Sequence, residues 1–187
     1  MEEKDFERAM ASTIAAGFKL NPPGFERLNY WTYILSHVAT ALDCFIYAKV
    51  MPFEEGNFGN IRRQRAFFVA GIVAYGRCFV QAGRGIPSLD AKSVFSKRPD
   101  LMKIHRRLIE LRNTFAAHAD QSDIVRTTLA VREAGKRLQI RTLIATTIPA
   151  DEVPGYLETL DLIQNFADRK INRIVTRLER DMGKTIE

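Results

Sequence analysis

The sequence contains only two cysteines, Cys44 and Cys78, among 187 residues, and each lies within an apolar helical pattern. Small secreted domains that depend on disulfides carry many more, so we expect no disulfide framework and a reducing, cytoplasmic environment. Histidine is also scarce. Three scattered histidines and two distant cysteines do not give the ligand spacing of a metal site, so the sequence predicts neither a metal ion nor another cofactor.

Long apolar runs are missing as well. The first ten residues, MEEKDFERAM, lack the basic region and apolar run of a secretory signal. The most apolar segment, 28–51, is interrupted by Asp43 and Lys49, so it predicts a buried helix rather than a membrane span. A phosphate-binding glycine loop, a dinucleotide fingerprint and a nucleophile elbow are also absent, which argues against those enzyme classes.

Basic residues exceed acidic ones by 28 to 22, giving a formal charge of +6. Such an excess favours polyanionic partners, because binding phosphates releases their counterions. Hydrophobic residues make up 46% of the chain, which is enough for an ordinary globular core.

Apolar residues three or four apart predict a mainly helical chain. The expected helices span 3–19, 25–51, 61–82, 99–118 and 151–182, with a short segment around Ser93. Two alternating runs, 124–133 and 137–148, predict a β-hairpin. The fold class is therefore all-α: a single domain over residues 1–187, built as an antiparallel up-and-down helical bundle with a β-hairpin inserted before the last helix, at about 123–148.

The hairpin is expected to have two unlike faces, because successive strand residues point to opposite sides. The apolar face holds Val125, Leu129, Val131, Leu138, Ile140 and Ile144, and the other holds Arg126, Arg132, Gln139 and Arg141.

The segment 101–120, LMKIHRRLIELRNTFAAHAD, carries the most informative pattern. Its apolar stripe is Leu101, Ile104, Leu108, Leu111 and Phe115, and His118 continues that stripe three residues later. Arg112 follows Leu111 and so lies on the flank of the stripe. Polar groups beside a buried seam are costly unless partnered, which makes Arg112 and His118 candidates for a functional role.

Arg112 and Asn113, followed by four residues and then His118, resemble the R-N-x4-H motif of the HEPN superfamily. The resemblance implies a helical homodimer in which the motifs of two subunits face each other and cleave RNA without a metal ion. It also implies a prokaryotic toxin–antitoxin or antiviral defence context, with an antitoxin or activating partner.

The residue types suit this chemistry. Histidine titrates near neutral pH and transfers protons, so His118 is the expected acid or base. The permanently charged, forked guanidinium of Arg112 is suited to stabilise the charged phosphoryl oxygens. Asn113 is expected to position them.

Structural interpretations remain open beside the functional ones. Arg112 would instead pair with a carboxylate such as Glu110 or Asp120, and His118 would be a core histidine bonded to a backbone carbonyl. His105 is interpreted as a half-exposed helical histidine, and His37 as a core one. Two groups of arginines are interpreted as ordinary solvent-exposed faces. They would instead bind the RNA backbone if they lay beside the cleft between the two motifs. The groups are Arg62, Arg63 and Arg65, and, on the hairpin, Arg126, Arg132 and Arg141.

The sequence therefore predicts a metal-independent HEPN-type endoribonuclease acting on RNA as a homodimer. Two alternatives stand beside it: a non-catalytic HEPN-like module that binds nucleic acid or a partner protein, and a helical dimerisation scaffold.

Overall fold

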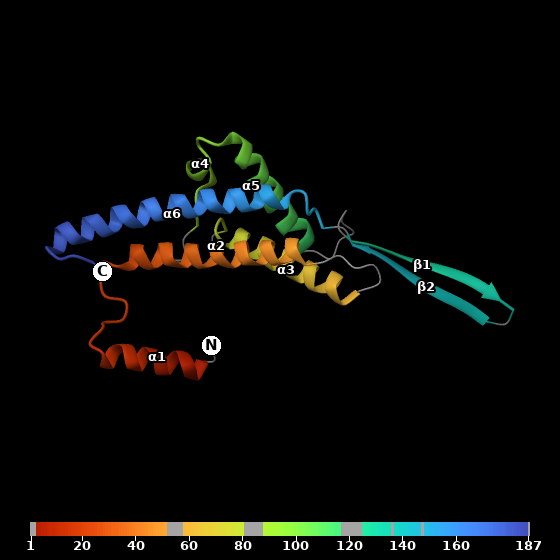
Figure 1. The fold of residues 1–187 in the computed structure, drawn as a ribbon, viewed down its shortest axis with the longest axis horizontal. Helices are drawn as coiled ribbons and strands as arrows, with labels where there is room; N and C mark the ends of the chain where they lie inside the picture. The colour runs from red at the N-terminus through yellow and green to blue at the C-terminus, as the bar shows by residue number, and fades with distance from the viewer. Residues whose placement is uncertain are drawn as a thin grey trace.

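The computed structural model describes residues 3–51, 58–80, 88–116, 125–135, 137–146 and 148–186. They form a mostly helical protein with one small antiparallel hairpin (Figure 1). In chain order the elements are α1 (Glu3–Ala15), α2 (Glu26–Val50), α3 (Phe58–Arg77), α4 (Ala91–Val94), α5 (Pro99–Leu111), the π-helical turn η1 (Arg112–Ala116), β1 (Val125–Ala134), β2 (Arg137–Thr146) and α6 (Val153–Met182). None of the described helices offers the apolar length that a membrane crossing requires.

The core is built around α2, which packs against both α3 and α6. Apolar side chains spaced along α2, including Ile34, Val38 and Phe45, are buried because their three- and four-residue spacing places them on one face. Phe68 of α3 and Tyr156 of α6 meet Phe45, with ring centroids 5.9 and 5.2 Å from its own. Among the described elements, α5 closes the other side of this core through contacts with α6 and α3.

The helix ends follow the sequence signals. Pro99 stands in the first turn of α5, and Asp90 caps α4 by accepting hydrogen bonds from the backbone N–H of Lys92 and Ser93. Gly183 ends α6 with a φ of 63°, as expected of a glycine after a helix, because a side chain is strained in that left-handed conformation.

The hairpin confirms the predicted division into two faces. Its register pairs Val131 with Ile140 and Arg132 with Gln139, so apolar and basic side chains alternate between the faces. The ribbon projects away from the helices (Figure 1). Its apolar residues Leu129, Val131, Leu138 and Ile140 are therefore each at least 60% exposed.

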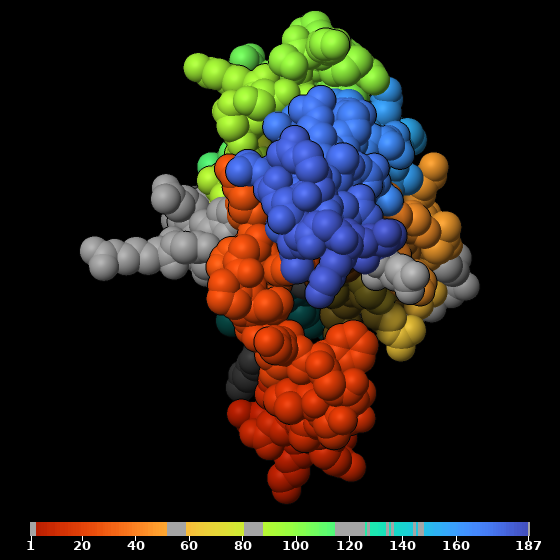
Figure 2. Space-filling view, turned by 90° about the vertical axis from the view of Figure 1, so that its left-hand side faces the viewer, coloured from red at the N-terminus to blue at the C-terminus, as the bar shows by residue number. Residues whose placement is uncertain are grey.

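The N-terminal helix α1 also stands apart from the helical body (Figures 1 and 2). Phe6 and Ile14 are 53% and 55% exposed, although they lie on the apolar face predicted from their spacing. The prediction of a helix here is thus confirmed, and the helix ends at Ala15, four residues earlier than expected.

Candidate functional site

The candidate site begins where α5 changes its hydrogen-bonding pattern. Leu101, Leu108 and Leu111 are buried along one face of α5 and anchor it in the core. After Leu111 the chain forms the π-helical turn η1 instead of continuing as an α-helix. A π turn is rare and is often found at functional sites. The motif residues Arg112 and Asn113 are the first two residues of this turn.

The structure brings Arg112 and Asn113 into direct contact. The guanidinium Nη1 of Arg112 donates a hydrogen bond to Oδ1 of Asn113, at 3.0 Å. The hydrocarbon part of the arginine lies across Gly76 of α3, where an added Cβ would come within 2.7 Å of Arg112 Cδ. A glycine at this position therefore lets the arginine lie directly on the α3 backbone.

The charge of Arg112 is not matched by a neighbouring acid among the described residues. One carboxylate considered as its structural partner, that of Glu110, instead accepts from Arg107 at 3.3 Å. Arg107 also pairs with Glu152 at the start of α6. Within the described ranges no carboxylate lies within 4.0 Å of the Arg112 guanidinium, so the structural pairing with Glu110 is excluded. Asp120, the other carboxylate considered, lies outside the described residues.

His118 likewise lies outside the described residues. The structure therefore gives the position of two of the three predicted catalytic residues, Arg112 and Asn113. Arg112 is half-buried and Asn113 is exposed, which places this pair at the edge of the core.

His105 corrects one expectation. Instead of being half-exposed it is buried, only 8% exposed, with its Nδ1 2.8 Å from the hydroxyl of Tyr75. The rings of Phe79 and Phe95 surround it, at centroid distances of 4.4 and 5.1 Å. Burial, helped by the nearby positive charge of Arg106, lowers the pKa of His105 to about 4. His105 is thus a neutral core residue.

His37 was predicted to be a core histidine and is half-buried on α2. Its ring meets Tyr33 edge-on, with centroids 4.4 Å apart, and its Nε2 is buried with no hydrogen-bond partner among the described residues. Burial, followed by the charge of Arg77, lowers the pKa of His37.

The two predicted arginine groups lie on separate elements. Arg62, Arg63 and Arg65 are exposed in the first half of α3. They are eleven to fourteen residues from Gly76, or roughly 17–21 Å along the helix axis. Arg126, Arg132 and Arg141 share one face of the hairpin and are exposed, and Arg132 donates to Gln139 Oε1 at 2.6 and 3.2 Å.

Sequence reasoning missed a third basic cluster, which lies between α2 and α6. Arg27, Lys170, Arg173 and Arg177 line an open groove there, together with Tyr30 and Trp31. The only signals were a spacing of three and four between the basic residues of α6 and a spacing of four between Arg27 and Trp31. The two helices are more than a hundred residues apart in sequence, so neither signal indicates that they meet.

Within the part of the chain that the structure describes, no three histidine, cysteine or acidic residues are grouped as metal ligands. Comparison with protein-family models, with curated proteins and with solved structures gives no match.

Proposed function

We propose that this chain is a metal-independent endoribonuclease of the HEPN type, acting as a homodimer. The observation that supports the proposal most is the hydrogen-bonded pair of Arg112 and Asn113 at the π-helical end of α5. Its guanidinium is held in place by a neutral amide and, among the described residues, has no carboxylate within ion-pair distance. A phosphate would therefore not have to displace a described acid to reach it.

The proposed reaction is attack of an RNA 2′-hydroxyl on the adjacent phosphorus. His118 accepts the hydroxyl proton or donates one to the departing 5′-oxygen, since imidazole titrates near neutral pH. Arg112 stabilises the charge that builds up on the phosphoryl oxygens. Asn113 holds the Arg112 fork through the 3.0 Å hydrogen bond. The products are a 2′,3′-cyclic phosphate and a 5′-hydroxyl end.

Two further parts of the proposal come from the sequence pattern: long helices with short connections favour an antiparallel up-and-down bundle, and the scarcity of cysteine favours the cytoplasm. The family resemblance adds that two subunits bring their motifs into one cleft, and that the protein is a toxin or an antiviral effector with an antitoxin or an activating partner. Two subunits also solve a geometric difficulty: on a straight α-helix, residues six apart are about 9 Å apart along the axis and point in different directions.

Induced expression of the wild-type and His118→Ala proteins in cells tests the proposal, with growth and total RNA integrity followed together. The expected result is growth arrest with fragmented RNA for the wild type, both abolished in His118→Ala. Equal toxicity of the two proteins would contradict the role of His118. Harmlessness of both would favour the second candidate.

The second candidate is a non-catalytic module that binds nucleic acid through the basic face of the hairpin. The observation in its favour is that Arg126, Arg132 and Arg141 share one face of a projecting ribbon and are exposed. Purified protein would then bind RNA with an affinity that falls steeply with salt, but would leave the RNA intact.

A further inference from the structure

A groove lies between α2 and α6, away from the motif residues. It has a volume of about 860 Å³ and lies where the first turns of α2 meet the second half of α6. Figure 2 views the molecule from this end, with the C-terminal part of α6 beside the start of the α2 segment. The groove shares Lys170 and Arg173 with a second hollow of about 380 Å³, so the two adjoin along α6.

The lining of the groove is strongly basic. Arg27, Lys170, Arg173 and Arg177 contribute four cationic groups, against one carboxylate, that of Asp181. Asp181 is already engaged by Arg177 and Arg180, at 3.3 and 3.2 Å. For Arg27 and Arg173, no carboxylate lies within ion-pair distance in the described parts of the chain. The adjoining hollow adds Lys97, Arg169 and Arg98, the last of which is paired with carboxylates.

Aromatic rings lie among these cations. Tyr30 and Trp31 line the groove and meet edge-to-face with centroids 4.8 Å apart. Trp31 also contacts Phe166, at 6.0 Å, and Lys170 lies 5.2 Å from the Phe166 ring centroid. All three rings pack against the hydrophobic core, so they are held in place before anything binds.

Basic and aromatic groups combined in a groove are the features that hold single-stranded nucleic acid, because cations bind the backbone and rings stack on bases. We propose that the α2/α6 groove is a binding site for single-stranded RNA. Arg27, Lys170 and Arg173 bind its phosphates, and Tyr30 and Trp31 stack on its bases. The choice of RNA rests on the proposed function, and the groove itself rests on independent residues.

The groove is separate from the Arg112–Asn113 pair. α6 meets the motif helix near its own start, where Gly155 lies against Ile104. The groove begins at Lys170, fifteen residues or about 22 Å further along α6. We therefore expect it to hold RNA at a distance from the cleavage motif, which means that binding and cleavage can be lost independently.

The chain contains a single tryptophan, Trp31, so its fluorescence reports directly on this groove. The test titrates a 12-nucleotide single-stranded RNA into full-length His118→Ala protein, following both Trp31 fluorescence and the anisotropy of labelled RNA. We expect saturable quenching of Trp31 with the same Kd as the anisotropy. Double-stranded RNA of the same sequence should quench much less, because its bases are already stacked.

Charge reversal gives the second arm. The double variant Arg27→Glu/Arg173→Glu should bind the RNA at least tenfold more weakly. The slope of log Kd against log salt concentration should also decrease, by the amount that about two phosphate contacts contribute. The control reverses Lys49 and Lys103, two exposed lysines outside the groove, and changes the net charge equally. RNA binding without a change in Trp31 fluorescence, or equal weakening by both double variants, would overturn the proposal.

The two proposals fail in different ways. Quenching by RNA without any cleavage by the wild type would support the groove and count against the nuclease. Cleavage with undisturbed Trp31 fluorescence would support the nuclease and count against the groove. Quenching by vesicles of phosphatidylcholine and phosphatidylserine, with none by RNA, would assign the groove to a membrane surface and overturn the proposal.

Discussion

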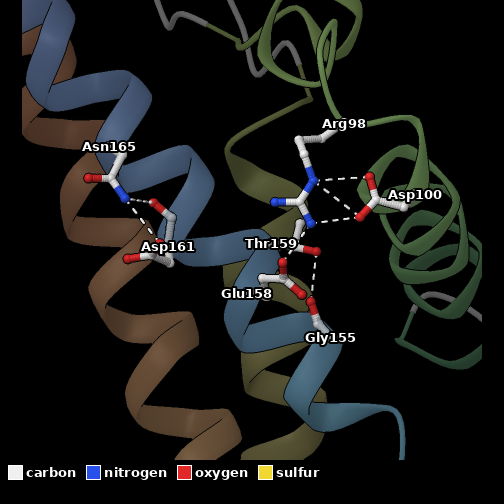
Figure 3. A network of polar contacts seen from close by, with 7 residues as sticks. All are labelled: Arg98, Asp100, Gly155, Glu158, Thr159, Asp161 and Asn165. Atoms are coloured by element: carbon white, nitrogen blue, oxygen red, sulfur yellow. Dashed lines mark hydrogen bonds and ion pairs between the residues drawn. The ribbon is translucent and has the colours of Figure 1, made fainter.

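The two ends of α5 carry arginines with opposite surroundings. At the start, Arg98 forms an ion pair with Asp100, with Nη2–Oδ2 at 2.6 Å, and a second one with Glu158 on α6 (Figure 3). At the end, Arg112 donates to the neutral amide of Asn113, and the described residues place no carboxylate within ion-pair distance of it. The same residue type therefore has two settings: Arg98 ties α5 to α6, whereas the Arg112 guanidinium has a neutral amide as its hydrogen-bond partner among the described residues.

The carboxylate of Asp100, at the start of α5, is itself affected by this pairing. The side-chain hydrogen bond from Arg98 is the largest cause that lowers the pKa of Asp100, to about 2. Asp100 also stands in the first turn of the helix, where a negative charge is favoured. An anionic ligand would have to compete with two carboxylates for Arg98, and we expect it to bind Arg112 instead.

The largest expected effect comes from Arg112→Lys, which keeps the charge but removes the forked donor. We expect RNA cleavage to fall at least about 100-fold, a loss typical of removing one donor to a charged transition state. Arg98→Lys is the matched variant and should cleave within about twofold of the wild type. Initial rates on a labelled RNA check both, and equal losses would remove the distinction between the two ends.

A smaller loss is expected for Gly76→Ala. The new methyl group would come within 2.7 Å of Arg112 Cδ and push the guanidinium out of place. We expect cleavage to fall about tenfold, since small displacements of a catalytic group are costly.

Gly155→Ala is a closely matched control, because its Cβ would meet Ile104 Cδ1, also at 2.7 Å, away from the motif. It should lose stability without a comparable loss of cleavage. Similar cleavage by both alanine variants, measured with their thermal unfolding, would show that the position of Arg112 does not matter.

The buried middle of α5 gives a pH dependence. The pKa of His105 is about 4 in the folded protein, below its ordinary value of 6.5. Between these two pH values the unfolded chain therefore binds a proton at His105 and the folded chain does not. The free energy of unfolding should therefore fall as the pH drops from about 6.5 to about 4, by about 3 kcal/mol. Chemical denaturation of the wild type and His105→Gln checks this. The variant should lack this part of the slope, and parallel curves would contradict the assignment.

The smallest effect is expected for Arg98→Ala. Its ion pairs are on the surface, and such pairs contribute little because water screens them. We expect Tm to fall by a few degrees at most, while the cleavage rate is unchanged. A large loss of cleavage, measured at a temperature where the variant is folded, would mean that the start of α5 takes part in the reaction.

Much of this fold is predictable from the sequence, because helical periodicity and strand alternation are local. The long helix over 151–182 and the division of the hairpin into an apolar and a basic face were both predicted and are confirmed. The packing of α1 and the hairpin was not predictable, since an apolar face such as that of Leu129 and Val131 does not reveal whether anything in the same chain covers it.

The details of the candidate site were less accessible. The burial of His105 depends on Tyr75, Phe79 and Phe95, which come from other parts of the chain. The change from α- to π-helix at Arg112 is a shift in backbone hydrogen bonding, which the pattern of side chains does not predict. The contact between Arg112 and Gly76 joins α3 to the end of α5, so only the tertiary structure reveals it.

The proposed nuclease activity is tested most directly by cleavage of single-stranded RNA by purified protein in the presence of EDTA, with the wild type and His118→Ala compared. We expect the wild type to produce fragments with 2′,3′-cyclic phosphate and 5′-hydroxyl ends, and His118→Ala to be at least about 100-fold slower. Cleavage that stops with EDTA, or that proceeds equally in the two proteins, would contradict the proposal.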